Sequence, residues 1–329
     1  MENFKNSPLV KKIGFNRIVL CGVLLLMYII FAIVSPTFLS YSRILSALNY
    51  AYFLGFLALG VTFVIATGGI DFSIGPVMFC AALMGGRLLV KDGVPVIVAL
   101  LACLLVGFVF GVINGYLVAY MGLPSFISSM ALMMLAKGVG SVFTQTQSIS
   151  WPQGTDPNGL GWFRNLIKMK VGGVDIPTGL IWLLIVAVIC AIILNNTKIG
   201  RYILCLGSNK EAVRLSGVNV KKWEMIAFII SGTLAGMAAI AYVSAYTTVT
   251  PSGGDIFNND AIASCVMGGT SMSGGLASIG GSIIGVMIIS LLQEGILAMG
   301  FQKDYQYIIT GIIVLLAVFA DVRSRRRKN

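Results

Sequence analysis

Histidine is absent from this sequence, and charged residues are scarce. Of its 329 residues, 12 are Asp or Glu and 23 are Lys or Arg, which together make up 11% of the chain. Without histidine the chain lacks the commonest general base and metal ligand of proteins. No GxxxxGK[ST] sequence occurs either, so the chain does not carry the P-loop that binds ATP in many ATPases. We therefore predict no catalytic residues, no metal site and no cofactor in this chain itself.

Cysteine is present but scattered. Cys205 lies in a charged segment, and the other five of the six cysteines lie in apolar segments: Cys21, Cys80, Cys103, Cys190 and Cys265. No CxxC pair occurs, so the spacing predicts neither a disulfide framework nor a metal cluster.

Hydrophobic residues, in contrast, make up 57% of the chain, which is typical of polytopic membrane proteins rather than soluble domains. A membrane-spanning helix needs about 20 apolar residues. We therefore predict an all-α membrane protein, a single transmembrane domain over residues 1–329. Its ten expected helices cover residues 17–35, 44–66, 71–90, 94–121, 125–146, 177–195, 223–246, 259–272, 275–299 and 305–321.

The net charge of +11 follows this topology and forms no nucleic-acid footprint. Basic residues concentrate in the tails over 1–16 and 322–329 and in a central loop over 196–222. The positive-inside rule places all three in the cytoplasm, and the even number of helices between them agrees. Residues 146–176 then form a long extracytoplasmic loop.

Aromatic residues of this loop are expected at the membrane interface, where amphipathic rings gather. They are Trp151, Trp162 and Phe163.

Two short segments resemble each other and predict a weak inverted repeat. Gly68-Gly69-Ile70-Asp71-Phe72-Ser73 precedes one apolar stretch, and Gly253-Gly254-Asp255-Ile256-Phe257-Asn258 precedes another. The predicted topology starts the first stretch inside and the second outside. Glycine-interrupted helices in such repeats lie near the substrate path of transporters.

Small residues also form ridges on three predicted helices, and such ridges allow close approach of helix backbones in lipid. The ridges favour packing within one bundle over dimerisation. They are Gly107-x3-Gly111-x3-Gly115, Gly232-x3-Gly236 and Gly281-x3-Gly285.

The central loop is expected to contain a short helix with its own start and stop. Ser208 suits the N-cap, Glu211 three residues later completes a capping box, and Gly217 suits the left-handed residue after the last turn. A short charged helix on the face of a membrane protein suggests docking to a partner, which we expect to be an ATPase. The docking residues would be Ser208, Asn209, Lys210, Glu211, Ala212, Arg214, Leu215 and Gly217.

Polar residues in apolar surroundings are candidates for the substrate path, because an ionised Asp at mid-bilayer costs about 2.5–3.5 kcal/mol. The candidates are Asp71, Ser73, Asn114, Asp260 and Ser264. Three of them have a structural alternative: Asp71 and Asp260 can cap the helices that follow them, and Asn114 can make an interhelical hydrogen bond. These alternatives stay open at the level of sequence.

Several blocks of the chain, taken in order, resemble the permease subunits of ribose-type monosaccharide ABC importers. This family belongs to the ribose/branched-chain amino acid permease superfamily, and the resemblance runs from about residue 40 to the end. The blocks are Ala66-Thr67-Gly68-Gly69-Ile70-Asp71-Phe72-Ser73-Ile74-Gly75, Gly200-Arg201 with Gly207 to Gly217, Asp260-Ala261-Ile262-Ala263 with Gly268 to Gly275, and Gln306-Tyr307-Ile308-Ile309 leading to Ala320-Asp321.

The resemblance implies the ten-helix fold of the vitamin B12-type (type II) importers, in a bacterial inner membrane with both termini cytoplasmic. It implies three partners: an ATP-binding cassette ATPase that holds ATP and Mg²⁺, an extracytoplasmic sugar-binding protein, and a second permease copy or paralogue. The implied cargo is a monosaccharide or small polyol, and the helix over 208–217 would be the coupling helix in the ATPase groove.

The sequence departs from the family pattern at places that bear on the substrate. Asn258 stands where an acidic residue is usual, Tyr246 to Val249 replace an Arg-containing stretch, and Gln293-Glu294-Gly295 replaces Asn-Gly. A secondary transporter, a membrane enzyme and a receptor are the rival classes.

Overall fold

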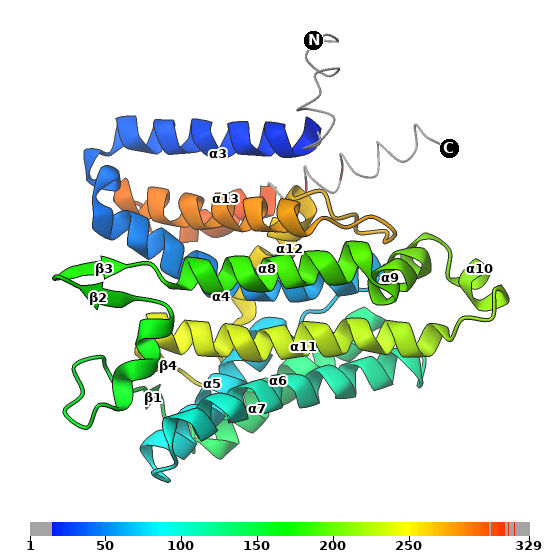
Figure 1. Ribbon diagram of the computed structural model, residues 1–329, viewed down its shortest axis with the longest axis horizontal. Coiled ribbons are helices and arrows are strands. Elements are labelled where there is room, and N and C mark those ends of the chain that lie inside the picture. Colours follow the sequence, from blue (N-terminus) through cyan, green and yellow to red (C-terminus); the bar gives the residue numbers. More distant parts are fainter. Residues whose placement is uncertain (1–14, 303, 313–314, 316–318, 320–329) are drawn as a thin grey trace.

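The protein is a bundle of long helices that run side by side, with short strands at one end (Figure 1). The computed structural model describes residues 15–302, 304–312, 315 and 319. Residues 304–312 are helical, and η2 (Leu160–Leu166) is a 3₁₀ helix in the long loop. The other helices are α3 (Phe15–Val34), η1 (Pro36–Leu39), α4 (Tyr41–Ala66), α5 (Ile74–Val90), α6 (Val96–Ala119), α7 (Ser125–Phe143), α8 (Gly179–Asn196), α9 (Lys198–Ser208), α10 (Lys210–Leu215), α11 (Val220–Ala245), α12 (Asp255–Met267) and α13 (Ile279–Ala298).

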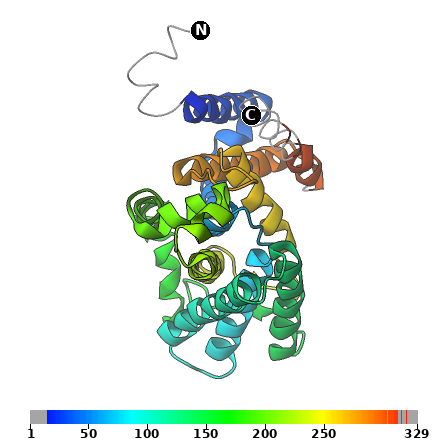
Figure 2. The ribbon, with the colours of Figure 1, turned by 90° about the vertical axis from the view of Figure 1, so that its right-hand side faces the viewer.

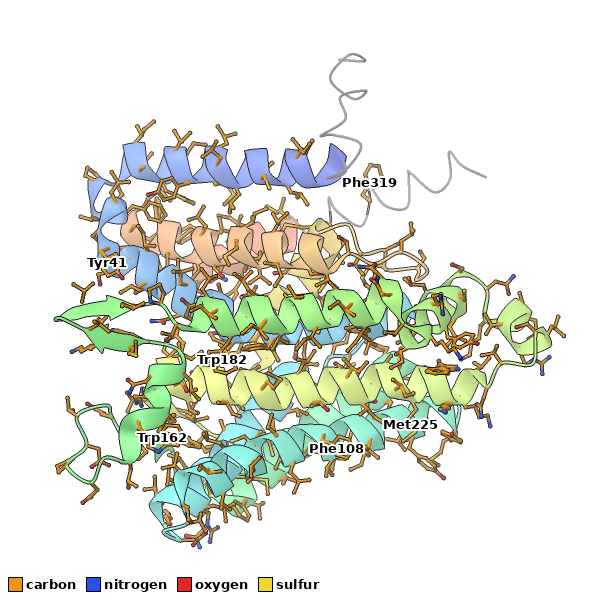
Figure 3. All side chains as sticks on the ribbon, viewed as in Figure 1. Tyr41, Phe108, Trp162, Trp182, Met225 and Phe319 are labelled. Atoms are coloured by element: carbon orange, nitrogen blue, oxygen red, sulfur yellow. The ribbon has the colours of Figure 1, made fainter. Side chains whose placement is uncertain are left out.

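The described helices confirm a helical, polytopic membrane protein. Six of them are long and apolar enough to cross a membrane, namely α4, α6, α7, α8, α11 and α13. Two shorter apolar helices, Ile18–Val34 and Ile74–Val90, add to these. Large apolar side chains cover the outward faces of α6 and α8, among them Phe108 and Trp182 (Figure 3). Such faces suit contact with lipid tails.

The helix α4 forms the centre of the core. Every residue from Tyr50 to Ala66 is buried, as expected for a helix that is apolar all round. It packs against α5, α8, α11, α12 and α13, and the view along the bundle shows these helices around it (Figure 2).

The predicted glycine ridges pack helices of this one chain against each other. A Cβ built on Gly107 would lie 2.3 Å from the carbonyl oxygen of Gly232, which places α6 and α11 in backbone contact. A Cβ built on Gly285 would lie 2.0 Å from the carbonyl oxygen of Ser264, which does the same for α13 and α12. The prediction that these ridges serve packing within the bundle is confirmed.

Two small antiparallel sheets lie at one end of the bundle, which we call the hairpin end. There β1 (Ile149–Ser150) pairs with β4 (Thr248–Val249), and β2 (Met169–Val171) pairs with β3 (Val174–Ile176). The long predicted loop over 146–176 is therefore partly structured.

Two of the three aromatic residues of this loop are buried within the protein and do not present their rings to the surroundings. Trp151 is buried and donates its indole N–H to the carbonyl oxygen of Ala82 at 3.1 Å. Phe163 is buried against Trp151, with ring centroids 5.4 Å apart. Both rings close the hairpin end of the core, because the loop folds back over α5. Trp162 remains exposed.

The predicted tails lie almost entirely outside the described residues. Residues 15 and 16 are the exception and belong to the first turn of α3. Of the last predicted span, 305–321, the described part is helical.

Candidate functional site

The short helix α10 projects from the end of the bundle opposite the hairpin end (Figure 1). Its N-cap is Asn209, whose side-chain oxygen accepts the N–H of Ala212 at 2.9 Å. Ser208 is instead the last residue of α9, and its hydroxyl donates to the carbonyl oxygen of Leu204 at 3.1 Å. The prediction of Ser208 as the N-cap is wrong by one residue, because α9 continues through Ser208 and the chain first becomes extended at Asn209.

The predicted capping box is wrong as well. Glu211 accepts two hydrogen bonds from Arg214, at 3.0 and 2.6 Å, within the helix itself. The hydrogen bonds from Arg214 lower the pKa of Glu211 below its ordinary value. Gly217 has φ +78° just beyond the C-cap residue Ser216, so the predicted left-handed stop is confirmed.

The helix α10 presents an apolar tip, flanked by charged residues, to solvent. Leu215 is 77% exposed, and Ala212 beside it is exposed as well. Arg214 and Glu211 are also exposed, whereas Val213 is buried and anchors the helix to the protein. Lys210 forms an ion pair with Glu224 of α11 at 2.8 Å. A projecting helix with this surface can fit a groove of another protein.

Behind α10, the end of α9 is wedged between two other segments. A Cβ on Gly207 would lie 2.0 Å from the carbonyl oxygen of Ala66 and 2.3 Å from the N–H nitrogen of Gly275. Gly275 in turn donates its N–H to the carbonyl oxygen of Ala66 at 3.0 Å. The end of α4, the 269–277 loop and the base of α10 thus share one backbone junction, which we call the Gly207 junction.

The chain leaves helical geometry between α4 and α5, and Asp71 stabilises this break. One oxygen of its buried carboxylate accepts the N–H and the hydroxyl of Ser73 at 3.0 and 2.6 Å, together with the amide of Asn114 at 3.3 Å. The other oxygen accepts the hydroxyl of Ser231 at 3.0 Å. Three of the predicted path residues therefore form one hydrogen-bonded cluster between α5, α6 and α11.

The helix α7 supports the same break. Ser128 donates to the side-chain oxygen of Asn114 at 2.7 Å, and Ser125 accepts the N–H of Ile70 at 3.1 Å. Each of these hydroxyls satisfies a polar group that lacks a helical partner. Their contribution was not predicted, because single serines in apolar segments give no sequence signal of their partners.

The two segments of the predicted repeat meet at the starts of α5 and α12. A Cβ on Gly75 would lie 2.1 Å from the carbonyl oxygen of Gly254. Asn258 joins the segments, accepting the N–H of Gly75 at 2.7 Å and donating to the carbonyl oxygen of Phe72 at 2.6 Å. Asn258 therefore uses both the oxygen and the nitrogen of its amide.

The other two predicted path residues lie on α12. Asp260 accepts hydrogen bonds from Tyr50 at 2.5 Å and from Gln306 at 3.1 Å, which connects α12 to α4 and to the helical residues 304–312. Ser264 donates to the carbonyl oxygen of Asp260 at 2.7 Å and is buried against α13. The cluster around Asp71 and the group around Asp260 are thus two separate polar sites.

An ion pair that the sequence did not predict connects α7 with the start of α12. The ammonium of Lys137 lies 2.5 Å from the carboxylate of Asp255, and the two side chains are 25% and 50% exposed. Lys137 lies about 18 Å along α7 from Ser125 and about 9 Å from Phe143, at 1.5 Å per residue. A lone Lys within an apolar run was the signal that could have marked Lys137, although not its partner.

Comparison with known proteins assigns the architecture to a family. Residues 43–318 match the family described as the permease component of the branched-chain amino acid transport system. The chain belongs to this permease family.

Individual relatives agree with this assignment. The permease is 33% identical to the ribose import permease protein RbsC of Escherichia coli strain K12 over 306 residues, 92% of each chain. It is 29% identical to the xylose transport system permease protein XylH of Haemophilus influenzae, covering 94% of this chain and 96% of that one. It is 32% identical to the fructose import permease protein FruG of Bifidobacterium longum, covering 82% and 79%. No solved structure matches the chain.

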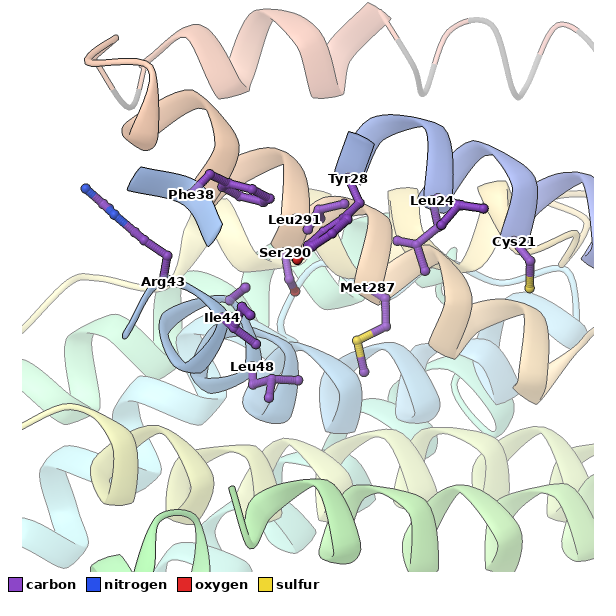
Figure 4. Close-up of a pocket in the computed structure, with 12 residues that line it drawn as sticks. Cys21, Leu24, Tyr28, Phe38, Arg43, Ile44, Leu48, Met287, Ser290 and Leu291 are labelled. Atoms are coloured by element: carbon purple, nitrogen blue, oxygen red, sulfur yellow. The ribbon is translucent and has the colours of Figure 1, made fainter. Parts of the chain in front are cut away.

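The permease also contains an apolar cavity of about 510 Å³ between α3, α4 and α13 (Figure 4). Leu24, Tyr28, Leu48 and Met287 are among the side chains that line it, and Arg43 lies at one end. Its lining offers few hydroxyl-binding groups, so it suits a lipid acyl chain better than a sugar.

Proposed function

We propose that this permease is the membrane-spanning subunit of an ATP-driven ABC importer for a monosaccharide or small polyol. The exposed tip of α10 carries this proposal. A permease needs such a projecting element only if a separate protein drives its conformational change, and the chain has no P-loop of its own. The ribose, xylose and fructose permeases among its relatives support a sugar as cargo.

In this proposal α10 is the coupling helix. Leu215 and Ala212 enter an apolar groove of the ATPase, while Glu211 and Arg214 contact charged residues at its rim. Closure of the two ATPase domains on ATP moves α10, and the Gly207 junction passes this motion to α4 and to the loop over 269–277. The ligand-bound state of the partner thereby selects between two conformations of the permease.

Ten membrane crossings, a vitamin B12-importer-like arrangement and an inverted repeat complete the proposal. The α10 end would face the cytoplasm, as both termini would, and the hairpin end would receive the sugar-binding protein. The starts of α5 and α12 meet inside the bundle, which supports the repeat because inverted halves place broken helices face to face.

The solute path would run along the face formed by α7, α12 and residues 304–312, opposite a second permease copy. The Lys137–Asp255 pair supports this choice, because ionisable groups at membrane depth face a water-filled path or a partner rather than lipid. Exposed apolar residues that a second copy can cover, among them Leu135 and Val139, lie on the side of α7 away from Lys137.

A secondary transporter of a small neutral solute is the alternative. It would need no ATPase, and its uptake would collapse with an ionophore but survive nucleotide depletion. The importer predicts the reverse pattern.

Affinity purification in mild detergent from the native cell, with ATPase activity assayed on the eluate, tests the proposal. We expect a Walker-motif ATPase to co-purify with the wild-type chain, and sugar-binding protein to stimulate its activity. Leu215→Asp should abolish co-purification, while Val171→Asp, an exposed change at the hairpin end, should not. A wild-type chain that folds, purifies alone and transports without nucleotide would contradict the proposal.

A further inference from the structure

The cavity between α3, α4 and α13 runs from the hairpin end of the bundle towards its middle. Arg43 lies at one end of the cavity and Cys21 at the other (Figure 4). Arg43 is in the first turn of α4, which begins at the hairpin end, where the hydroxyl of Tyr41 donates to the carbonyl oxygen of Asp175 in β3. Cys21 precedes Val34, the last residue of α3, by 13 residues, or about 20 Å at 1.5 Å per residue. The charged end of the cavity is therefore at the edge of the bundle.

The walls of the cavity are mainly apolar side chains. Its volume of about 510 Å³ falls within the range of small-molecule sites. The hydroxyl of Ser290 on its wall already donates to the carbonyl oxygen of Val286 at 2.8 Å. Leu25 lines the cavity and is still 61% exposed, so the cavity reaches the surface of the bundle. A hydrocarbon chain can enter there from the bilayer, whereas water would find few polar partners. The apolar lining includes Leu24, Leu25, Ile44, Leu48, Met287 and Leu291.

The helix α3 lies at the outer edge of the bundle, beyond α13 (Figures 1 and 2). It packs mainly against α13 and η1. At its hairpin end Phe31 joins Phe38, Leu292 and Ile296 in a small hydrophobic cluster that is separate from the main core. Further along α3, the cavity separates this helix from α4. A ligand in the cavity would therefore fill the space between α3 and α4.

The guanidinium of Arg43 can contact an anionic group at the mouth of the cavity. Its side chain is 37% exposed, and one of its nitrogens lies 3.4 Å from the carboxylate of Glu294. That distance is longer than the about 2.7–2.9 Å of a good charge-assisted hydrogen bond. A guanidinium has five N–H donors in a planar fork that matches the oxygens of a phosphate. One long contact leaves most of these donors for a second anionic group.

We propose that the cavity binds one acyl chain of a phospholipid whose phosphate contacts Arg43. The phosphate then lies at the hairpin end, where the bundle meets the membrane–water interface, and the chain extends inwards along Leu24, Leu48 and Met287. Each methylene group buried there adds hydrophobic free energy. Arg43 selects a phospholipid over other apolar molecules, because a phosphate supplies the anion that it can bind. The bound lipid joins α3 to α4, whether or not an ATPase drives the permease.

The experiment is native mass spectrometry of the full chain, delipidated in mild detergent and titrated with dioleoyl phosphatidylglycerol or with dioleoylglycerol. The second lipid has the same acyl chains and no phosphate. The wild type should bind the first phosphatidylglycerol at least tenfold more tightly than the first dioleoylglycerol, and Arg43→Gln should remove this difference. Glu294→Gln breaks the same ion pair but keeps Arg43, so it is the matched control and should preserve the difference.

A second variant tests the cavity itself. Ala47 lines the cavity, and the ring of Ala47→Phe would occupy it, so this variant should bind the first lipid of either kind at least tenfold more weakly. Ile189→Phe, at an exposed position of α8, is the matched control and should bind as the wild type does. If Ala47→Phe does not fold, the comparison of the two lipids on Arg43→Gln decides alone.

Two results would overturn the site. Equal phosphatidylglycerol affinity of the wild type, Arg43→Gln and Ala47→Phe would show non-specific lipid contact only. In a Cys205→Ser background, a disulfide between the Cys21 thiols of two copies would show that a second copy covers the cavity. Neither result depends on an ATPase or a sugar, so the lipid site and the importer stand or fall separately.

Discussion

The carbonyl oxygen of Ala66 occupies the space that a side chain on Gly207 would need, since a Cβ there would lie 2.0 Å away. Both partners in this contact are backbone atoms at helix ends, so no side-chain rotation can relieve it. The end of α9, at the base of α10, is therefore in direct backbone contact with the end of the central helix α4. This contact connects α10 to the core without any long side chain between them.

Replacing Gly207 with Ala should separate ATP hydrolysis from transport. The added methyl group must push α9 away from α4, and overpacking of this kind costs about 1–3 kcal/mol. We expect uptake to fall at least tenfold while the permease still reaches the membrane and still binds the ATPase. Gly22→Ala on α3, where nothing lies within 4 Å of the new methyl group, is the matched control. Coupled transport at the wild-type rate in Gly207→Ala would show that the junction is not part of the transmission.

Charge reversal on α10 tests the docking surface itself. Glu211→Lys removes the hydrogen bonds from Arg214 and places two cations one turn apart on the exposed face. We expect at least tenfold weaker ATPase binding, measured by co-purification, and loss of sugar-stimulated hydrolysis. Lys170→Glu on β2 reverses one exposed charge at the opposite end and should leave ATPase binding unchanged. Wild-type ATPase binding and uptake by Glu211→Lys would contradict the role of α10.

The Lys137–Asp255 pair provides a test of the proposed solute path. A single neutralisation leaves one charge without its partner, and at the centre of a membrane helix such a charge costs about 2.5–3.5 kcal/mol on insertion scales. We expect Lys137→Met and Asp255→Asn each to reduce uptake at least tenfold. The double exchange Lys137→Asp with Asp255→Lys should recover part of it, because the pair is restored.

Thiol labelling checks whether water reaches this pair. In a background with the exposed Cys21 and Cys205 replaced by Ser, Lys137→Cys should react with a charged, water-soluble thiosulfonate. Leu184→Cys on α8, an exposed apolar position, should not react because it faces lipid. An unreactive Lys137→Cys would mean that lipid or protein covers this face, and the path would have to lie elsewhere.

The sequence was informative where a feature is local. Continuous apolar runs located the helices of the bundle, and a glycine after a charged turn located the end of α10 at Gly217. The start of α10 was missed by one residue, because Ser208 and Asn209 are both good caps and the length of α9 decides between them. Local pattern cannot supply that length, since α9 is stabilised by packing of Ile203 and Leu206 into the bundle.

Contacts between segments that are far apart in the chain could not be predicted from the sequence. Lys137 and Asp255 are 118 residues apart, and neither alone indicates its partner. The burial of Trp151 depends on the loop folding back over α5, which a hydropathy pattern does not encode. Asp71 was recognised as unusual, yet whether it caps a helix or lines a path depends on Asn114 and Ser231, which other helices bring to it.

Substitutions of Asp71 distinguish its two possible roles. In the structure its carboxylate accepts four hydrogen bonds from Ser73, Asn114 and Ser231, so we expect its main task to be holding the break between α4 and α5. Asp71→Asn keeps the shape and one acceptor oxygen but loses charge-assisted bonds, which should destabilise the fold by about 2 kcal/mol. Asp71→Ala leaves several buried donors without a partner and should be more severe.

The measurement is the melting temperature of each purified variant beside its uptake rate. If uptake of Asp71→Asn falls only in proportion to its loss of folded protein, Asp71 is a structural residue. Loss of uptake at an unchanged melting temperature would instead place the carboxylate in contact with the solute, as the sequence alone allowed.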